Sequence, residues 1–174
     1  MHRRRHGRRR PVRGRALRPP LRRAPSAGSP AEGTTHILRA SLKPGLYRDV
    51  ECEGSASLRG LAEAIVLAFD FDFDHAFGFY SELGERYQDS PEKYELFADL
   101  GEAEPGVGSV EKTTISQAFP KVGKTMQFVF DYGDDWRFRL ELVKLGAKKP
   151  ATRYPRLLLA AGDAPAQYPG LDED

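Results

Sequence analysis

The hydrophobic pattern opens with two short alternating segments. Residues 36–42 (HILRASL) have apolar side chains at every second position, so these side chains share one side of an extended chain. Residues 46–52 (LYRDVEC) follow after a Pro-Gly turn signal. This alternation predicts a β-hairpin. Residues 58–69 change to apolar spacings of three and four, and Ser57 is placed to cap a helix. We expect this helix to pack its apolar stripe on the inner face of the hairpin.

The helical spacing gives way to a period of two in AFDFDFDHAFGFY (68–80). A single strand through this stretch would line its three aspartates along one face, about 7 Å apart, where their charges repel. A connection avoids that repulsion. We therefore expect the helix to end near Phe69 and the phenylalanines to pin a connection to the core. A strand then starts near Ala76, and the aspartates lie on the rim.

The later segments complete the fold prediction. The order of periodic segments predicts an α+β fold: a β-hairpin, a helix, then a mostly antiparallel sheet that ends in a long β-hairpin. The remaining expected elements are a strand pair, 77–83 with 93–99, a short helix, 115–119, the long hairpin, 125–145, and a short helix or apolar anchor, 154–161, stopped by Gly162.

The register of the long hairpin follows from keeping the apolar residues of both strands on one face. Opposed residue numbers must then have an even sum, because a slip of one residue turns a strand inside out. The tightest such loop spans residues 133–135 and sets Asp131 opposite Arg137 on the other face. On the apolar face, the expected opposed pairs are Tyr132 with Trp136, Phe130 with Phe138, and Phe128 with Leu140.

Length and composition indicate one globular domain. The 174 residues are 40% hydrophobic and 30% charged, and no apolar run reaches the roughly 20 residues that cross a bilayer. No secretory signal is visible, so we expect a cytoplasmic protein without a membrane partner. Cys52 is the single cysteine, which excludes an internal disulfide and a multi-cysteine zinc site. Its setting is typical of a small buried residue on a strand.

Charge is divided unequally along the chain. Residues 1–31 hold eleven arginines and no acid, which leaves 16 basic against 25 acidic residues in the remainder, a net of −9. We expect a disordered basic tail over 1–34, a domain over 35–169 and an acidic tail over 170–174. The basic tail would neutralise nucleic-acid phosphates without base selectivity. Alternatively, it is the translation of GC-rich DNA upstream of a misassigned start.

Residues 118–125 (AFPKVGKT) fit a loose phosphate-loop pattern. A phosphate loop needs converging backbone N–H groups, with a strand before it and a helix after it. Pro120 has no N–H to offer, and Thr125 begins an alternating segment. We interpret the motif as a turn and a strand start, not as a nucleotide site.

The candidate site residues are mainly aspartates, which lie in two clusters along the sequence. If the fold joins the two aspartate clusters, it forms an oxygen-rich Mg²⁺ or Ca²⁺ site from Asp72, Asp74, His75, Asp131 and Asp134. Otherwise these aspartates are ordinary turn residues that bind local backbone N–H groups. No catalytic triad or cofactor is expected, since the other histidines lie in the tail or, like His36, at the expected domain edge.

The hairpin, the helix, DFDHAFGFY and above all FDYGDDWRF resemble the plasmid pRiA4b ORF-3-like family over about 36–169. The resemblance implies an α+β domain found in bacteria and on mobile elements, without an established activity. Family members often carry a histidine two residues after the tryptophan. This chain has Phe138 there, so a potential metal ligand is missing.

Three functions remain as expectations. The first is a non-catalytic binding or interaction module that contacts a protein, a peptide or a small cationic partner. Its acidic and aromatic rim would comprise His75, Tyr132, Asp134, Asp135 and Trp136. The second is a metal-assisted enzyme that uses the aspartate and histidine cluster. The third is nucleic-acid association through the basic tail alone. The missing histidine and the lack of a nucleophile favour the first.

Overall fold

A computed structural model describes residues 33–170 of the chain. The expected basic and acidic tails lie almost wholly outside the described residues. The elements in chain order are β1 (Thr34–Lys43), β2 (Leu46–Glu53), α1 (Leu58–Ala68), β3 (Phe77–Tyr80), a 3₁₀ turn (Tyr87–Asp89), β4 (Lys93–Glu95), α2 (Leu96–Asp99), β5 (Gly108–Ser109), α3 (Ile115–Ala118), β6 (Thr125–Phe130), β7 (Trp136–Ala147) and β8 (Arg156–Ala161).

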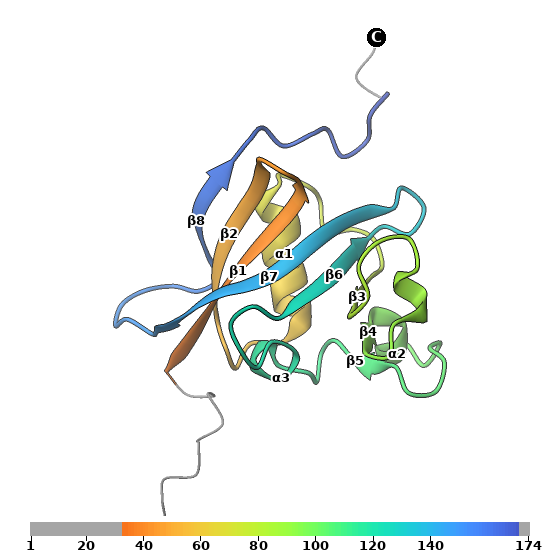
Figure 1. The fold of residues 1–174 in the computed structure, drawn as a ribbon, viewed down its shortest axis with the longest axis horizontal. Helices are drawn as coiled ribbons and strands as arrows, with labels where there is room; N and C mark the ends of the chain where they lie inside the picture. The colour runs from red at the N-terminus through yellow and green to blue at the C-terminus, as the bar shows by residue number, and fades with distance from the viewer. Residues whose placement is uncertain (1–32, 171–174) are drawn as a thin grey trace, which may run out of the picture.

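The strands form one sheet in the order β5-β4-β3-β6-β7-β1-β2-β8. All neighbours are antiparallel except β4 and β5. Figure 1 shows α1 lying across one face of this sheet. The predicted α+β class and the mostly antiparallel sheet are confirmed. No helix in residues 33–170 is long and apolar enough to cross a membrane.

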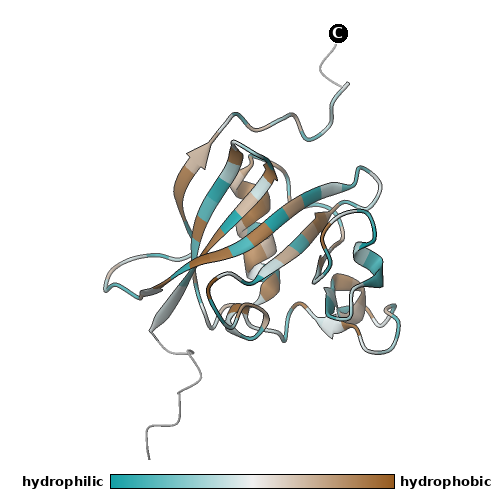
Figure 2. Ribbon diagram, in the orientation of Figure 1, coloured by the Kyte–Doolittle hydropathy of each residue, from teal (hydrophilic) through white to brown (hydrophobic). Residues whose placement is uncertain are grey.

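The first hairpin and its helix form as the pattern predicts. β1 and β2 pair antiparallel, and the Ser57 side chain accepts a hydrogen bond from the Gly60 N–H at 3.1 Å, which caps α1. The apolar stripe of α1 is buried against the sheet, as the brown helix and alternating strands of Figure 2 illustrate. Cys52 lies buried on β2, and burial raises the pKa of its thiol to about 12.

The connection after α1 also matches its prediction. The helix ends at Ala68, Phe69 and Phe71 are buried, and β3 starts at Phe77. The three aspartates between them are exposed. Asp70 has a φ of 59°, a left-handed conformation that aspartate tolerates better than most residues. The phenylalanines therefore anchor a segment that has no regular hydrogen-bond ladder of its own.

The predicted register of the long hairpin has the correct parity but the wrong pairs. Phe130 and Phe138 share the buried face as expected, yet Phe130 lies opposite Trp136. The loop spans Asp131 to Asp135 and not 133–135. Asp131 leaves the strand conformation with a φ of 60°, so the turn begins two residues earlier than the tightest loop would require. On the same register, the other pairs are Phe128 with Phe138, Met126 with Leu140, and Val129 with Arg137.

Two further consequences correct the sequence expectations. Tyr132 leaves the Trp136 face and packs with Tyr80 on the other side of the sheet. Arg137 does not lie opposite Asp131. It binds the carboxylate of Asp135, with Nε–Oδ1 and Nη2–Oδ2 distances of 3.0 and 2.6 Å.

Two other segments differ from expectation. Residues 93–99 are a strand only to Glu95, after which α2 begins. Residues 156–161 form strand β8 instead of a helix or anchor, because the free edge of β2 supplies backbone partners for it. Gly162 ends β8 with a φ of 76°, where an added Cβ would lie 2.7 Å from the Gly45 carbonyl oxygen. Thr125 opens β6, as the interpretation of the GKT segment requires.

His36 lies in the core and not at the domain edge. The side chain is fully buried, and neither ring nitrogen makes a hydrogen bond of normal geometry within residues 33–170. Burial lowers the pKa of His36, and the nearby Phe119 backbone opposes this only in part. The folded state therefore disfavours the protonated form of the His36 ring.

We expect His36 to make the protein acid-sensitive. The unfolded chain protonates this residue near its ordinary pKa of about 6.5, whereas the folded chain resists protonation. The stability that depends on neutral His36 is present above that pH and is lost as pH falls towards the lowered pKa. Thermal melts from pH 7.5 to 5 should thus fall more steeply for the parent than for His36→Leu. Parallel curves for the two proteins would contradict this.

We also expect Phe130→Ala to lower the free energy of unfolding by about 3–5 kcal/mol, because it deletes a fully buried ring. Leu159→Ala, at a side chain that is 45% exposed on β8, serves as the control and should cost much less. Chemical denaturation measures both. Equal losses would show that the ring of Phe130 contributes no more than an exposed leucine.

Candidate functional site

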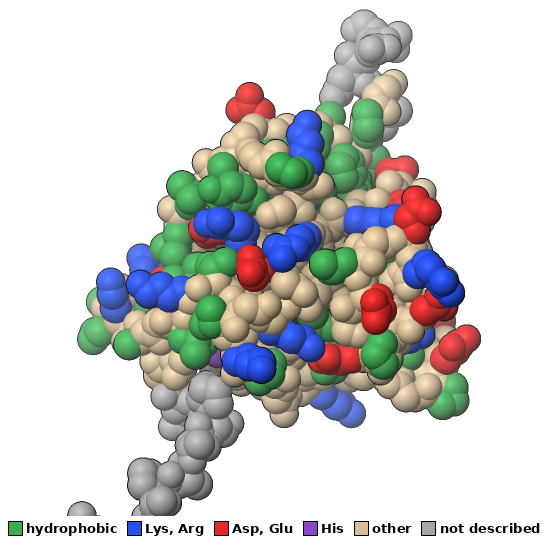
Figure 3. Space-filling view, in the orientation of Figure 1, with side chains coloured by type: hydrophobic (Ala, Val, Ile, Leu, Met, Phe, Trp, Pro, Cys, Tyr) green, Lys and Arg blue, Asp and Glu red, His purple; other side chains and the backbone are tan. Residues whose placement is uncertain are grey.

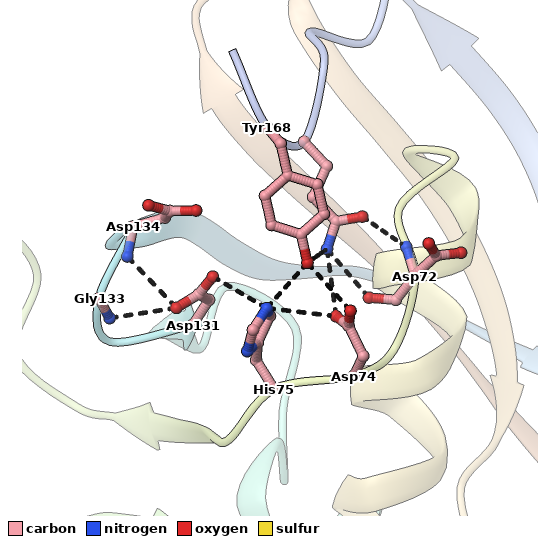
Figure 4. A network of polar contacts seen from close by, with 8 residues as sticks. Asp72, Asp74, His75, Asp131, Gly133, Asp134 and Tyr168 are labelled. Carbon is pink, nitrogen blue, oxygen red and sulfur yellow. Dashed lines mark hydrogen bonds and ion pairs between the residues drawn. The ribbon is translucent and has the colours of Figure 1, made fainter. Parts of the chain in front are cut away.

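Three segments that are distant in sequence meet around His75. They are the connection between α1 and β3, the β6–β7 loop and the C-terminal segment after β8 (Figure 4). The connection carries Asp74 and His75, the loop carries Asp131, and the C-terminal segment carries Gln167 and Tyr168. We call these five residues the histidine network.

The Nε2 atom of His75 is the centre of this network. It lies 2.8 Å from the Tyr168 hydroxyl, 3.3 Å from Asp131 Oδ2 and 3.5 Å from Asp74 Oδ1. The Tyr168 hydroxyl donates to Asp74 Oδ2 at 2.9 Å, so it accepts from the Nε2–H of His75. Hydrogen bonding to that carboxylate adds to desolvation in raising the pKa of Tyr168 to about 12. The Nε2 atom is thus engaged within the protein.

Gln167 ties the C-terminal segment to the connection. Its Oε1 accepts the Asp72 N–H at 2.7 Å, and its Nε2 donates to the Asp72 carbonyl at 3.1 Å. The same Nε2 lies 3.3 Å from Asp74 Oδ1. Because this side chain is buried, its hydrogen bonds replace those that water would otherwise make. Gln167 thereby holds Tyr168 in reach of His75.

The five suggested metal ligands are only partly brought together. Asp74 and Asp131 approach His75, but Asp72 joins through its backbone and its carboxylate points away from His75 in Figure 4. Asp134 donates its backbone N–H to Asp131 Oδ1 at 3.2 Å. Within residues 33–170, no group of three His, Cys, Asp or Glu side chains has an arrangement suited to a metal ion. The metal site remains a prediction without support from this geometry.

The predicted rim is divided by the β6–β7 loop. Trp136 packs on Phe71 with ring centroids 4.8 Å apart, and its Nε1 is buried with no hydrogen-bond partner in the described chain. Asp135 is engaged by Arg137. Tyr132 lies on the opposite side, away from His75. The rim residues therefore do not form one continuous surface.

Tyr132 lines a hollow of about 600 Å³ beside β4 and α2. Its hydroxyl lies 2.7 Å from the Tyr80 hydroxyl, and its ring stacks on Phe97 with a centroid distance of 5.5 Å. Tyr80 is almost fully buried and also lines the hollow. Burial raises the pKa of both tyrosines, and both hydroxyls are protonated at physiological pH. We call this site the tyrosine hollow.

Carboxylates surround the tyrosine hollow. Its lining contains Asp89, Glu95, Glu102 and Glu104 against a single cation, Lys93. Asp89 is bound by Arg86 at 2.9 Å, whereas the other three carboxylates make no ion pair within 4 Å in residues 33–170. Figure 3 shows acidic side chains on the side of the molecule that carries β4 and α2.

Glu95 is the electrostatically unusual member of the lining. Burial raises its pKa above the ordinary value, and the positive charge of Lys93 and the Tyr80 hydroxyl oppose this only in part. A carboxylate that is partly removed from water without an ion-pair partner is unfavourable in its charged form. A ligand with a positive charge would therefore bind favourably beside such a carboxylate.

Residues 35–170 match the family model described as plasmid pRiA4b ORF-3-like protein. The chain belongs to this family. The matched region contains both the histidine network and the tyrosine hollow.

A solved structure supports the fold of this pRiA4b ORF-3-like protein. It is similar to the protein of unknown function MM3350 from Methanosarcina mazei Go1, with a TM-score of 0.60 and 20% sequence identity. The likeness covers 74% of this chain and 70% of that chain. At this identity it shows a shared fold. No curated protein matches the chain significantly.

Several site residues escaped the sequence prediction for the pRiA4b ORF-3-like protein. Gln167 and Tyr168 contact residues more than ninety positions away, and no local pattern indicates such a pairing. The alternating pattern assigned Tyr80 and Phe97 to predicted strands, with no sign that they line a hollow. Glu95 carried one weak signal, since it is a charge between the apolar residues of YELF. Its unusual environment depends on the tertiary structure.

We expect Gln167→Ala to loosen the histidine network. Loss of its buried hydrogen bonds should lower the free energy of unfolding by about 1–3 kcal/mol and speed amide exchange at Asp72. Hydrogen exchange followed by NMR measures the local effect. Gln88→Ala, at an exposed glutamine, is the control. Unchanged amide exchange at Asp72 in the Gln167 variant would show that the hydrogen bonds of Gln167 do not hold this segment.

Proposed function

We propose that this protein is a binding module whose tyrosine hollow receives a cationic group, a guanidinium or an alkylammonium, carried by a protein, a peptide or a small molecule. The observation that carries the proposal is Glu95. Its ionised form is disfavoured by partial burial, and a bound cation would relieve that penalty. Stability alone gives no reason to keep a carboxylate there.

The aromatic walls suit the same ligand. Phe97 and Tyr132 stack on one another, and the Tyr80 hydroxyl is hydrogen-bonded to the Tyr132 hydroxyl. Aromatic faces attract cations by about 0.5–2 kcal/mol, more when water is excluded. The volume of about 600 Å³ is in the range of sites that accept a side chain or a small molecule. Charge and shape therefore favour one class of ligand.

The histidine network supports binding over catalysis. Nε2 of His75, the nitrogen that faces Asp74 and Asp131, carries the proton that it donates to Tyr168, so it has no free lone pair for a metal ion or a substrate proton. The lone pair of the neutral ring is on Nδ1, away from these two carboxylates. These carboxylates accept hydrogen bonds from Tyr168, Gln167 and the β6–β7 loop. We interpret the network as a support that fixes the loop on which Tyr132 stands. The metal-assisted alternative would require this network to open.

The test is a titration with N-acetyl-arginine N-methylamide, whose only charge is the guanidinium, followed by NMR at the amides of Glu95, Phe97 and Tyr132. We expect saturable shifts at these residues, and at least a tenfold loss of affinity in Glu95→Gln. The uncharged citrulline analogue should not bind. Glu63→Gln, at an exposed residue of α1, is the matched control. Shifts spread over the whole acidic surface, or equal affinity in Glu95→Gln, would overturn the proposal.

The pH dependence gives a second measurement on the same variant. Binding requires ionised Glu95, so affinity should fall as pH drops through the raised pKa of this residue. The sign for stability is opposite. A carboxyl whose pKa is raised by folding lowers stability as pH rises above its unfolded pKa, and the loss is complete above the raised value. Glu95→Gln should therefore melt higher than the parent at pH 7 while it loses the ligand.

A further inference from the structure

We infer that, in the free protein, an arginine side chain from residues 1–31 of the same chain binds in the tyrosine hollow for part of the time. The inference rests on the proposed function of the hollow and adds to it a competitor built into the protein. An external cationic ligand must then displace an internal one. The basic segment would set the threshold at which a partner binds.

Charge is the first argument. Residues 1–31 carry eleven arginines and no acid, whereas the remainder of the chain has a net charge of −9. In the tyrosine hollow, Glu95, Glu102 and Glu104 make no ion pair in residues 33–170. Segments of opposite charge on one chain attract each other at low and moderate ionic strength. The carboxylates of the hollow supply unpaired negative charge for such a contact.

The chemistry of guanidinium is the second argument. The fold already seats arginines on aromatic rings, with Arg39 4.2 Å from the Tyr47 centroid and Arg48 4.7 Å from the Phe69 centroid. Within residues 33–170, no Arg or Lys lies over Phe97 or Tyr132. These two rings border carboxylates, and planar guanidinium both stacks on rings and pairs with carboxylates. An arginine fits the hollow better than a lysine does.

Residues 1–31 are also long enough to extend across the folded domain. A chain of about 30 residues can span at most roughly 100 Å when fully extended. A folded domain of about 140 residues has a radius of gyration of about 14 Å, so such a chain can span its surface. Tethering at this length gives an effective concentration on the order of 1 mM. A contact with a dissociation constant of about 1 mM would therefore be made about half of the time.

Competition tests the inference on the full chain. The N-acetyl-arginine N-methylamide titration is repeated on the parent and on a variant with all eleven arginines of residues 1–31 changed to glutamine. We expect the variant to bind the probe about two- to tenfold more tightly at low salt, and the difference to shrink in 0.5 M NaCl. Equal affinities at low salt would overturn the internal competitor and leave the proposed function standing. No binding to either chain would overturn both.

A spin label supplies a direct measurement. Cys52 is buried, so a label placed by Ser26→Cys reacts selectively at the tail. We expect it to broaden the amides of Glu95 and Phe97 more than those of Leu157 and Leu159 on β8, and the excess to disappear in Glu95→Gln. Equal broadening at both sets of amides, or an excess that survives Glu95→Gln, would show that the tail does not enter the hollow.

Discussion

The conformation of Asp131 is the constraint on which both sides of this molecule depend. Its left-handed φ of 60° ends β6, and its Oδ1 accepts the N–H groups of Gly133 and Asp134. Its backbone N–H donates to the Ala76 carbonyl at 2.9 Å, and its carbonyl accepts the Asp135 N–H. Its Oδ2 faces His75. One residue thus fixes the turn, joins it to the connection after α1 and completes the histidine network.

The geometry of that turn separates two chemistries that are adjacent in sequence. On one side, His75 and its partners satisfy one another. On the other side, Tyr132 borders a hollow in which Glu95, Glu102 and Glu104 make no ion pair within the described chain. A satisfied polar network makes the structure rigid, whereas an unsatisfied charge stores a free energy that a ligand can release. This contrast is why we propose a supporting role for the histidine network and a ligand-binding role for the tyrosine hollow.

The aromatic core allows the protein to keep an unfavourable carboxylate. Phenylalanines from the connection, β3, β6 and β7 pack together in one buried cluster, which includes Phe69, Phe71, Phe77, Phe128, Phe130 and Phe138. Each buried aromatic ring contributes several kcal/mol to stability. A penalty at Glu95 is small beside that sum. The core thereby allows the fold to keep a carboxylate at a position that is not optimised for stability.

Several elements could be predicted from local patterns alone. Alternation and helical spacing identified the first hairpin, α1, the connection and the parity of the long hairpin, because a strand or helix imposes its period on the chain locally. FDYGDDW identified the family. The register around Asp131, the strand character of β8 and the contact of His75 with Tyr168 depend on the folded structure. Each of these depends on a partner many residues away, such as the free edge of β2 or the carbonyl of Ala76, and a local pattern carries no record of such partners.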